Sequence, residues 1–171
     1  MLKPLFLYPR RIFAGMALAC VALLAFAVLY LQNIVGLEPC PMCIVQRDAF
    51  IVLALCSLLA ALTSRRWLWF LWGGLGILAA AFGAFTAARQ SWLQWNPPEF
   101  ATCGRDLYGI IESFPLGRAI PMIFRGSGDC SAVDWTLLGG SIANWSFLGF
   151  AGLGVLAILT LAAQRRSLPQ R

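Results

Sequence analysis

The sequence predicts an all-α integral membrane protein: a four-helix transmembrane bundle with a long, mostly irregular loop on one side. Two observations predict this class. Of the 171 residues, 60% are hydrophobic and only 12% are charged, whereas soluble domains carry about 25% charged residues. The apolar residues also gather in four long runs. So apolar a chain is not disordered and cannot hide its apolar surface as a soluble domain of this size. The length suits one membrane domain.

The four runs set the expected spans at about residues 12–31, 44–63, 67–88 and 145–163. A transmembrane helix needs about 20 mostly apolar residues, and the absence of water in lipid forces such segments to be helical. The second run reaches this length only when it is extended back through Arg47. The first is longer than the apolar part of a signal peptide and lacks a small-x-small site after it, so we expect it to be retained.

Basic residues set the expected orientation. Eight of the 13 Lys and Arg residues lie in the segments before the first span, between the second and third, and after the fourth: Lys3, Arg10, Arg11, Arg65, Arg66, Arg165, Arg166 and Arg171. The other side has two loops, residues 32–43 and 89–144. The first of these loops has no basic residue and the second has four. The positive-inside rule therefore places both termini in the cytoplasm. The net charge of +6 reflects this topology, and nothing in it points to nucleic acid.

Topology sorts the six cysteines. Cys20 and Cys56 lie within spans, where a free cysteine behaves as a small apolar residue. The other four fall in the two outer loops. Cys40 and Cys43 form the motif Cys-Pro-Met-Cys, and a second pair has 26 residues between its members. Because thiols outside the cytoplasm tend to oxidise, a close pair and a distant pair suggest two disulfides.

Two alternatives remain for the outer cysteines. A zinc site would need all four of them, since the chain has no His, and the second pair lacks the short spacing usual in structural zinc sites. Cys103 and Cys130 could also form a static structural disulfide. The segment that they flank includes an apolar stretch, Pro115–Phe124, which fits a short interfacial segment.

The position of the Cys-Pro-Met-Cys motif favours a reactive thiol. Cys43 is expected at or near the start of the second helix, where the helix dipole favours a thiolate. Arg47 lies four residues further, on the same helix face. A charge where the chain enters the bilayer is a candidate functional group. Arg47 could equally be an interface anchor or a partner of the neighbouring Asp48.

The pattern as a whole resembles the bacterial DsbB family of inner-membrane, quinone-reducing, disulfide-generating proteins. The resemblance rests on four spans, on Cys40-Pro-Met-Cys43 followed by Arg47, and on the segments Phe-Ala-Thr-Cys103 and Gly-Ser-Gly-Asp-Cys130. It covers nearly the whole chain. The joint placement of two cysteine pairs against four spans is far more specific than one Cys-x-x-Cys motif. The DsbA–DsbB–quinone route keeps the bacterial periplasm oxidising.

The resemblance implies a role for each site residue. Cys103 and Cys130 would form the disulfide that a reduced, DsbA-like periplasmic protein attacks, with the mixed disulfide at Cys103. Cys40 and Cys43 would reoxidise that pair, and Cys43 would be the thiolate that meets ubiquinone or menaquinone. Arg47 would lie beside the quinone and stabilise negative charge. The protein would be a dithiol:quinone oxidoreductase of the bacterial inner membrane that passes electrons from its partner to the quinone pool.

One feature departs from the family pattern. Some members carry a histidine just after the third span that has been linked to the quinone, and here that stretch reads Ala88-Arg89-Gln90-Ser91. Arg89 is a substitute candidate for that role.

Three other function classes fit parts of the pattern. The first is a tetraspan structural protein with static disulfides, and the second is a metal-binding or transport protein. The third is a quinone enzyme similar to vitamin K epoxide reductase, but in that family the Cys-x-x-Cys motif lies in a late helix. Here the motif opens the second span.

Overall fold

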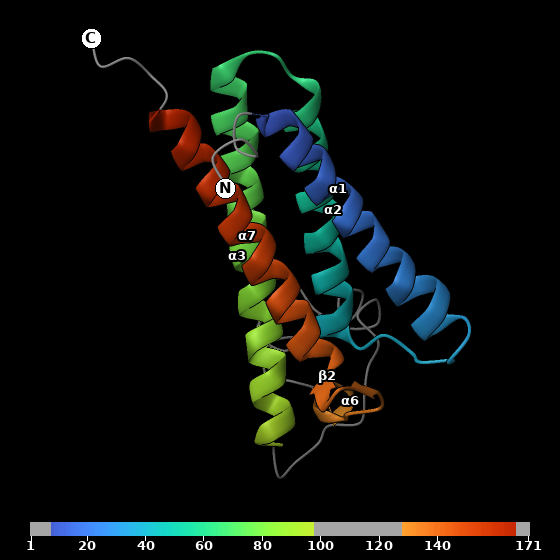
Figure 1. Cartoon of the computed structure of the whole chain (residues 1–171). Helices are drawn as coiled ribbons and strands as arrows, with labels where there is room; N and C mark the ends of the chain where they lie inside the picture. Colours follow the sequence, from blue (N-terminus) through green and yellow to red (C-terminus); the bar gives the residue numbers. More distant parts are fainter. Residues whose placement is uncertain (1–7, 98–127, 167–171) are drawn as a thin grey trace, which may run out of the picture.

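The computed structural model describes residues 8–97 and 128–166. Along the chain the elements are α1 (Pro9–Ala25), η2 (Phe26–Gln32), α2 (Pro41–Leu62), α3 (Arg66–Trp95), α6 (Gly128–Ser131), β1 (Thr136–Leu137), β2 (Gly140–Ser141) and α7 (Ile142–Arg166). The N-terminal end of α1, the connection from α2 to α3 and the C-terminal end of α7 lie at one end of the molecule (Figure 1). The link from η2 to α2, the end of α3, α6 and the hairpin lie at the other, which we call the cysteine end.

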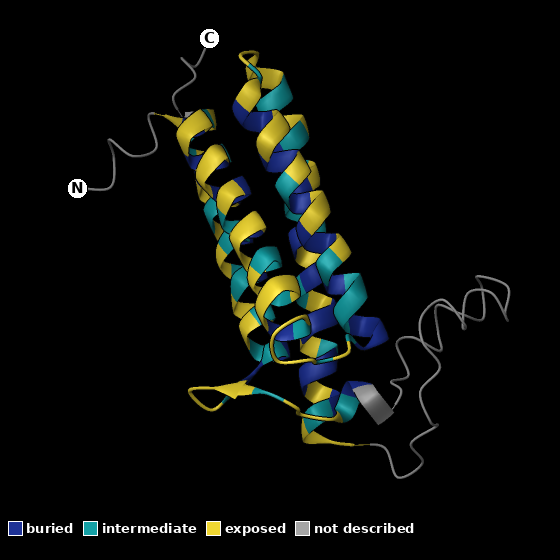
Figure 2. Ribbon diagram, turned by 90° about the vertical axis from the view of Figure 1, so that its right-hand side faces the viewer, coloured by how far each residue is buried: buried dark blue, intermediate teal, exposed yellow. Residues whose placement is uncertain are grey.

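Four helices in the described part are long and apolar enough to cross a membrane: Pro9–Gln32, Pro41–Leu62, Arg66–Trp95 and Ile142–Arg165. The predicted all-α, four-span membrane class is therefore confirmed. Large apolar side chains point outward along these helices, as with Leu18, Leu78 and Phe85, each more than 60% exposed. Figure 2 shows this pattern as exposed outer faces around a narrower buried seam. Such outward apolar faces suit contact with lipid rather than water.

The helices begin and end somewhat differently from the expected spans. The first helix starts at Pro9, and the third continues past Ala88 to Trp95, because helix-compatible residues continue until Asn96 and the prolines after it. The fourth begins at Ile142, where Ser141 Oγ accepts a hydrogen bond from the Asn144 backbone N–H as an N-cap. The expected loop 89–144 is thus shorter at both ends, and its last part carries α6 and the hairpin.

Helix α3 is the centre of the bundle, because it packs along both α2 and α7, whereas α1 packs mainly on α2. Small residues allow this close approach. A Cβ atom at Gly83 would overlap the ring of Phe150, and Gly154 lies against Ala80. The Phe150 ring also stacks on Phe50 of α2, with centroids 3.8 Å apart. The small-residue faces of α3 and α7 therefore pack the bundle.

The first span does not stay α-helical. From Phe26 to Gln32 it continues as a π-helix, a wider turn that is rare and often found at functional sites. Its last turn leads into a link with Gly36 at a φ of +79°, a conformation that suits glycine. This element brings Ala27 and Gln32 next to the start of α2.

A short antiparallel hairpin closes the cysteine end, with Thr136 paired to Ser141 and Leu137 to Gly140. Side-chain hydrogen bonds hold this region to α3. Ser141 Oγ donates to Gln94 Oε1 at 2.6 Å, and Gln94 Nε2 donates to the carbonyl of Ala132 at 3.4 Å. The segment that carries Cys130 is thereby attached to the last turns of α3.

Candidate functional site

The Cys-Pro-Met-Cys motif forms the first turn of α2. Cys40 is the N-cap residue, with extended backbone, and Pro41 opens the helix, a position where the lack of a proline N–H costs nothing. The Cys40 sulfur accepts a hydrogen bond from the Cys43 backbone N–H at 3.3 Å. The two sulfur atoms lie 2.7 Å apart. Only a small movement of the two side chains would therefore be needed for these thiols to form a disulfide.

Cys130 of α6 joins the motif from the far part of the chain. It is fully buried, in a cluster with Cys40, Met42 and Leu93. Hydrogen bonding with Cys130, then with Cys43, together with burial, raises the pKa of the Cys40 thiol well above its ordinary value. Cys40 therefore interacts with Cys43, its partner in the motif, and with Cys130, which belongs to the other expected pair. Such an arrangement suits exchange from one pair to the other, because exchange requires a sulfur to approach a sulfur.

Other cysteines are placed differently. Cys103 and the apolar stretch Pro115–Phe124 lie outside the described residues. Cys20 is completely buried in α1 and Cys56 is 7% exposed in α2. Both pack within the bundle, away from the motif.

Arg47 lies one turn beyond Cys43, half-buried. Its Nη1 donates to Gln32 Oε1 at 2.7 Å, and Nη2 donates to the carbonyl oxygen of Ala27 at 3.4 Å. Both acceptors belong to η2. These hydrogen bonds direct the guanidinium toward the first span, while Asp48 is exposed. Among the described residues, Arg47 forms no ion pair with Asp48.

Two buried glutamines complete the polar surroundings of the motif. Gln46 and Gln90 are 3% and 4% exposed, and Gln46 Nε2 donates to Gln90 Oε1 at 2.6 Å. Gln90 Nε2 lies 3.4 Å from the sulfurs of both Cys40 and Cys43. Hydrogen-bond donors at this distance stabilise a thiolate.

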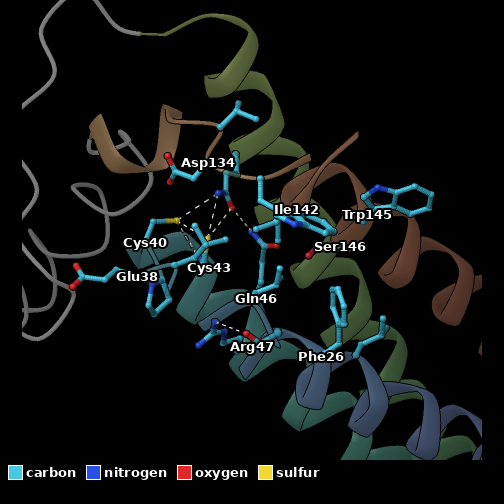
Figure 3. Close-up of a pocket in the computed structure, with 18 of the residues that line it drawn as sticks. Phe26, Glu38, Cys40, Cys43, Gln46, Arg47, Asp134, Ile142, Trp145 and Ser146 are labelled. Atoms are coloured by element: carbon cyan, nitrogen blue, oxygen red, sulfur yellow. Dashed lines mark hydrogen bonds between the residues drawn. The ribbon is translucent and has the colours of Figure 1, made fainter. Parts of the chain in front are cut away.

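A pocket of about 280 Å³ opens beside the motif. Figure 3 shows Cys43, Gln46 and Arg47 along the start of α2, with Ile142, Trp145 and Ser146 of α7 across the pocket. Its wall is mostly apolar and comes from α1, η2, α2, α7 and the link between α6 and β1: Leu23, Leu24, Phe26, Leu31, Phe50, Trp135, Ile142 and Trp145. A largely apolar pocket with a few polar groups at one end is typical of a small-molecule site.

Within the described residues, no group of three or more His, Cys, Asp or Glu side chains is arranged to hold a metal ion. Cys40 and Cys130 share one buried cluster, against which Cys43 packs, and the Gln90 amide donates to the sulfurs of Cys40 and Cys43. Cys103, the fourth cysteine of the zinc alternative, lies outside the described residues.

Comparison with known proteins bears on this arrangement. The model of the family "Disulfide bond formation protein DsbB" matches residues 9–160, nearly all of the chain. The chain belongs to the DsbB family. This DsbB-family protein is therefore a multi-pass membrane protein of disulfide bond formation.

Several similar curated proteins are called Disulfide bond formation protein B. The protein of Verminephrobacter eiseniae is 64% identical over 163 residues, which are 95% of this chain and 92% of the relative. That of Acidovorax sp. is 62% identical over 161 residues, 94% and 92% of the two chains. That of an Azoarcus sp. is 50% identical over 157 residues, 91% and 94%.

Sequence reasoning missed Gln46, Gln90 and Gln32 as members of the site. For the position after the third span it named Arg89 as a substitute candidate for a role toward the quinone, which stays a prediction, and it did not name Gln90, whose side chain contacts the cysteines. A signal existed for Gln46, which follows Cys43 by three residues on one helix face. No such signal existed for Gln90, because its contact depends on how α3 packs against α2.

Proposed function

We propose that this protein is a dithiol:quinone oxidoreductase of the bacterial inner membrane, which reoxidises a DsbA-like periplasmic protein and passes the electrons to ubiquinone or menaquinone. One observation carries the proposal. Cys40 and Cys43 line one end of a mostly apolar pocket that Arg47 also lines, and Cys130 packs against these two cysteines. Family membership supports the disulfide chemistry, and the pocket supports an apolar electron acceptor.

The residues of the pocket fit a quinone. Its ring is flat and apolar, which suits a wall that includes Phe26, Trp135 and Trp145. Its oxygens are hydrogen-bond acceptors, which suits the Arg47 guanidinium on the same pocket. When bound, a quinone supplies an acceptor for two electrons and two protons.

The relay that we propose has balanced steps. The thiolate of the reduced partner attacks a Cys103–Cys130 disulfide, the partner leaves as its disulfide, and the two loop cysteines become thiols. A loop thiolate then attacks the Cys40–Cys43 disulfide, which restores the loop disulfide and leaves Cys40 and Cys43 reduced. Contact between Cys130 and Cys40 supports this second step. Cys43, held beside the pocket and close to donors, would then pass the electron pair to the quinone acceptor, the two thiol protons would end on the quinol, and the Cys40–Cys43 disulfide would re-form.

The first experiment is an absorbance assay of quinone reduction. Purified protein in detergent receives excess quinone and a reduced, thioredoxin-like periplasmic oxidase. We expect one quinol for each partner disulfide formed, and no reduction by the Cys43→Ser variant. Cys103→Ser and Cys130→Ser should lose turnover with the protein partner but keep turnover with a small dithiol, which can reach Cys40 and Cys43 directly.

The same assay distinguishes the proposed enzyme from a structural membrane protein. A tetraspan protein with static disulfides would leave quinone unreduced and would show no change in its thiol count when the reduced partner is added. Loss of both partner-driven and dithiol-driven turnover in the Cys130→Ser variant would contradict the relay itself.

A further inference from the structure

The buried contact between Gln46 and Gln90 carries an inference that rests on the proposed function and deepens it. Gln90 sits on α3 at a place where its amide can meet both sulfurs of the motif. An amide has two different ends, a carbonyl oxygen that only accepts and an NH₂ group that only donates. The end that lies nearer the sulfurs decides whether the site favours a thiolate or a neutral thiol.

Gln46 determines that choice. Its Nε2 donates to Gln90 Oε1 at 2.6 Å, so the carbonyl oxygen of Gln90 is engaged by Gln46, and the Gln90 NH₂ group lies 3.4 Å from each sulfur. The same oxygen is a longer-range acceptor for the Cys43 thiol, at 3.8 Å. Both side chains are nearly inaccessible to water, so neither is readily paired with solvent instead. With the Gln46 amide in its present orientation, turning the Gln90 amide over would place two donors against each other, which is costly for buried groups.

We propose that Gln90 is a permanent, uncharged hydrogen-bond donor to the reacting sulfurs of Cys40 and Cys43, and that Gln46 is a positioning residue that fixes the direction of the Gln90 amide. The pair thereby stabilises the reduced motif with a thiolate at Cys43. Stabilising the reduced form makes a disulfide more oxidising. An amide does not titrate, so the donor is present at every pH at which the protein is folded.

Other charged and titratable groups near the motif come from several elements. Cys130 lies on α6, Arg47 is on α2, and Glu38 and Asp134 line the pocket from the two links. The variants below leave all of these in place, so that a change in thiol reactivity reports on the two amides.

The test measures the motif itself, without quinone or partner. Gln90→Met removes the donor at similar side-chain length. We expect the Cys43 alkylation rate at neutral pH to fall about tenfold, as for the loss of one hydrogen bond to a charged group. The equilibrium constant for reduction of the motif by dithiothreitol should also fall about tenfold, a shift of about 30 mV toward more reducing potentials. Mass spectrometry of the peptide that contains Cys43 reads both quantities.

Gln46→Met tests the positioning role, because among the described residues no hydrogen bond joins Gln46 to either sulfur and its amide donates to Gln90 instead. We expect a severalfold fall in the same two quantities, and no further fall when Gln46→Met is added to Gln90→Met. Such non-additivity shows that one residue acts through the other. If Gln46→Met lowered both quantities equally in the unaltered protein and in the Gln90→Met variant, the positioning role would be overturned. If Gln90→Met left the reduction potential of the Cys40–Cys43 motif unchanged, the donor role would be overturned.

Controls keep the outcome decisive. Gln164→Met, at the opposite end of α7, makes the same substitution far from the motif and should change neither quantity. If Gln90→Met does not fold, Gln90→Glu keeps the shape and the bond from Gln46 but puts an oxygen against the sulfurs, and should give the same direction of change. Failure of the proposed function would appear instead as absent quinone reduction by the unaltered protein, with these thiol measurements unaffected.

Discussion

At the scale of single residues, the two cysteines of the motif differ although they are neighbours. Cys40 is a buried N-cap in contact with Cys130, whereas Cys43 is partly accessible and faces the pocket. Both cysteines line the pocket, but Cys40 also hydrogen-bonds with Cys130, and Cys43 is the more accessible of the two. This division gives each cysteine one step of the proposed relay.

This difference predicts the order of alkylation in the reduced protein. The raised pKa of Cys40 keeps its sulfur as a thiol at neutral pH and above, and the thiolate is the reactive form. Between pH 6 and 9 we expect iodoacetamide to modify Cys43 at least about tenfold faster than Cys40. Fragment mass spectrometry separates the two sites. Preferential modification of Cys40 would contradict the proposed division.

The second residue prediction concerns Arg47. Because its guanidinium lines the pocket and is held by Gln32 and Ala27, Arg47→Ala should lower quinone-dependent turnover at least about tenfold. Disulfide exchange with the partner should change less than about twofold in a single-turnover measurement. Arg47→Lys, which keeps a charge but not the two-armed geometry, should be intermediate. Equal losses in both assays would contradict a role at the pocket.

At the scale of the elements, the site depends on how helices meet. The hydrophobic runs were sufficient to predict four spans, because each helix must present apolar side chains to lipid along its whole length. The pairing of Gln46 with Gln90 was not predictable, since 44 positions separate them and only the packing of α3 against α2 brings them together. The π-helix Phe26–Gln32 has no known sequence signature among its apolar residues.

Close packing of α3 against α7 predicts a matched pair of glycine variants. Gly83→Ala places a Cβ atom in the space of the Phe150 ring, and we expect it to destabilise the protein by about 1–3 kcal/mol. Gly74→Ala lies on the same helix with nothing within 4 Å of the added Cβ, and should be neutral or stabilising by up to about 1 kcal/mol. Thermal unfolding in detergent compares them. A lower Tm for Gly74→Ala than for Gly83→Ala would refute the packing argument.

At the scale of the whole molecule, basic residues gather at the end opposite the cysteines. Arg10 of α1 donates its Nε hydrogen to the carbonyl oxygen of Ala61, near the end of α2, at 2.8 Å, so that one of these charges also ties two helices together. Arg65 and Arg66 lie at the turn from α2 to α3. The orientation expected from the positive-inside rule stays a prediction.

Reporter fusions test that orientation. We expect a fluorescent protein that matures only in the cytoplasm to fluoresce when fused after Arg171. Alkaline phosphatase, active only in the periplasm, should be active when inserted at the Leu138-Gly139 turn, an exposed hairpin tip. The reverse result for both fusions would place the cysteine end in the cytoplasm and would remove the basis for a periplasmic partner.

The stacked rings of Phe50 and Phe150 bear on whether turnover moves charge across the membrane. Phe50 lines the pocket and, with Phe150, closes the bundle beneath it. Among the buried residues of the described part there is no Asp, Glu, Lys or Arg, so the helices offer no charged relay from this floor to the far end. Protons released by thiols and taken up by the acceptor would then belong to the same compartment. We expect turnover in sealed vesicles to be electrically silent and to generate no membrane potential.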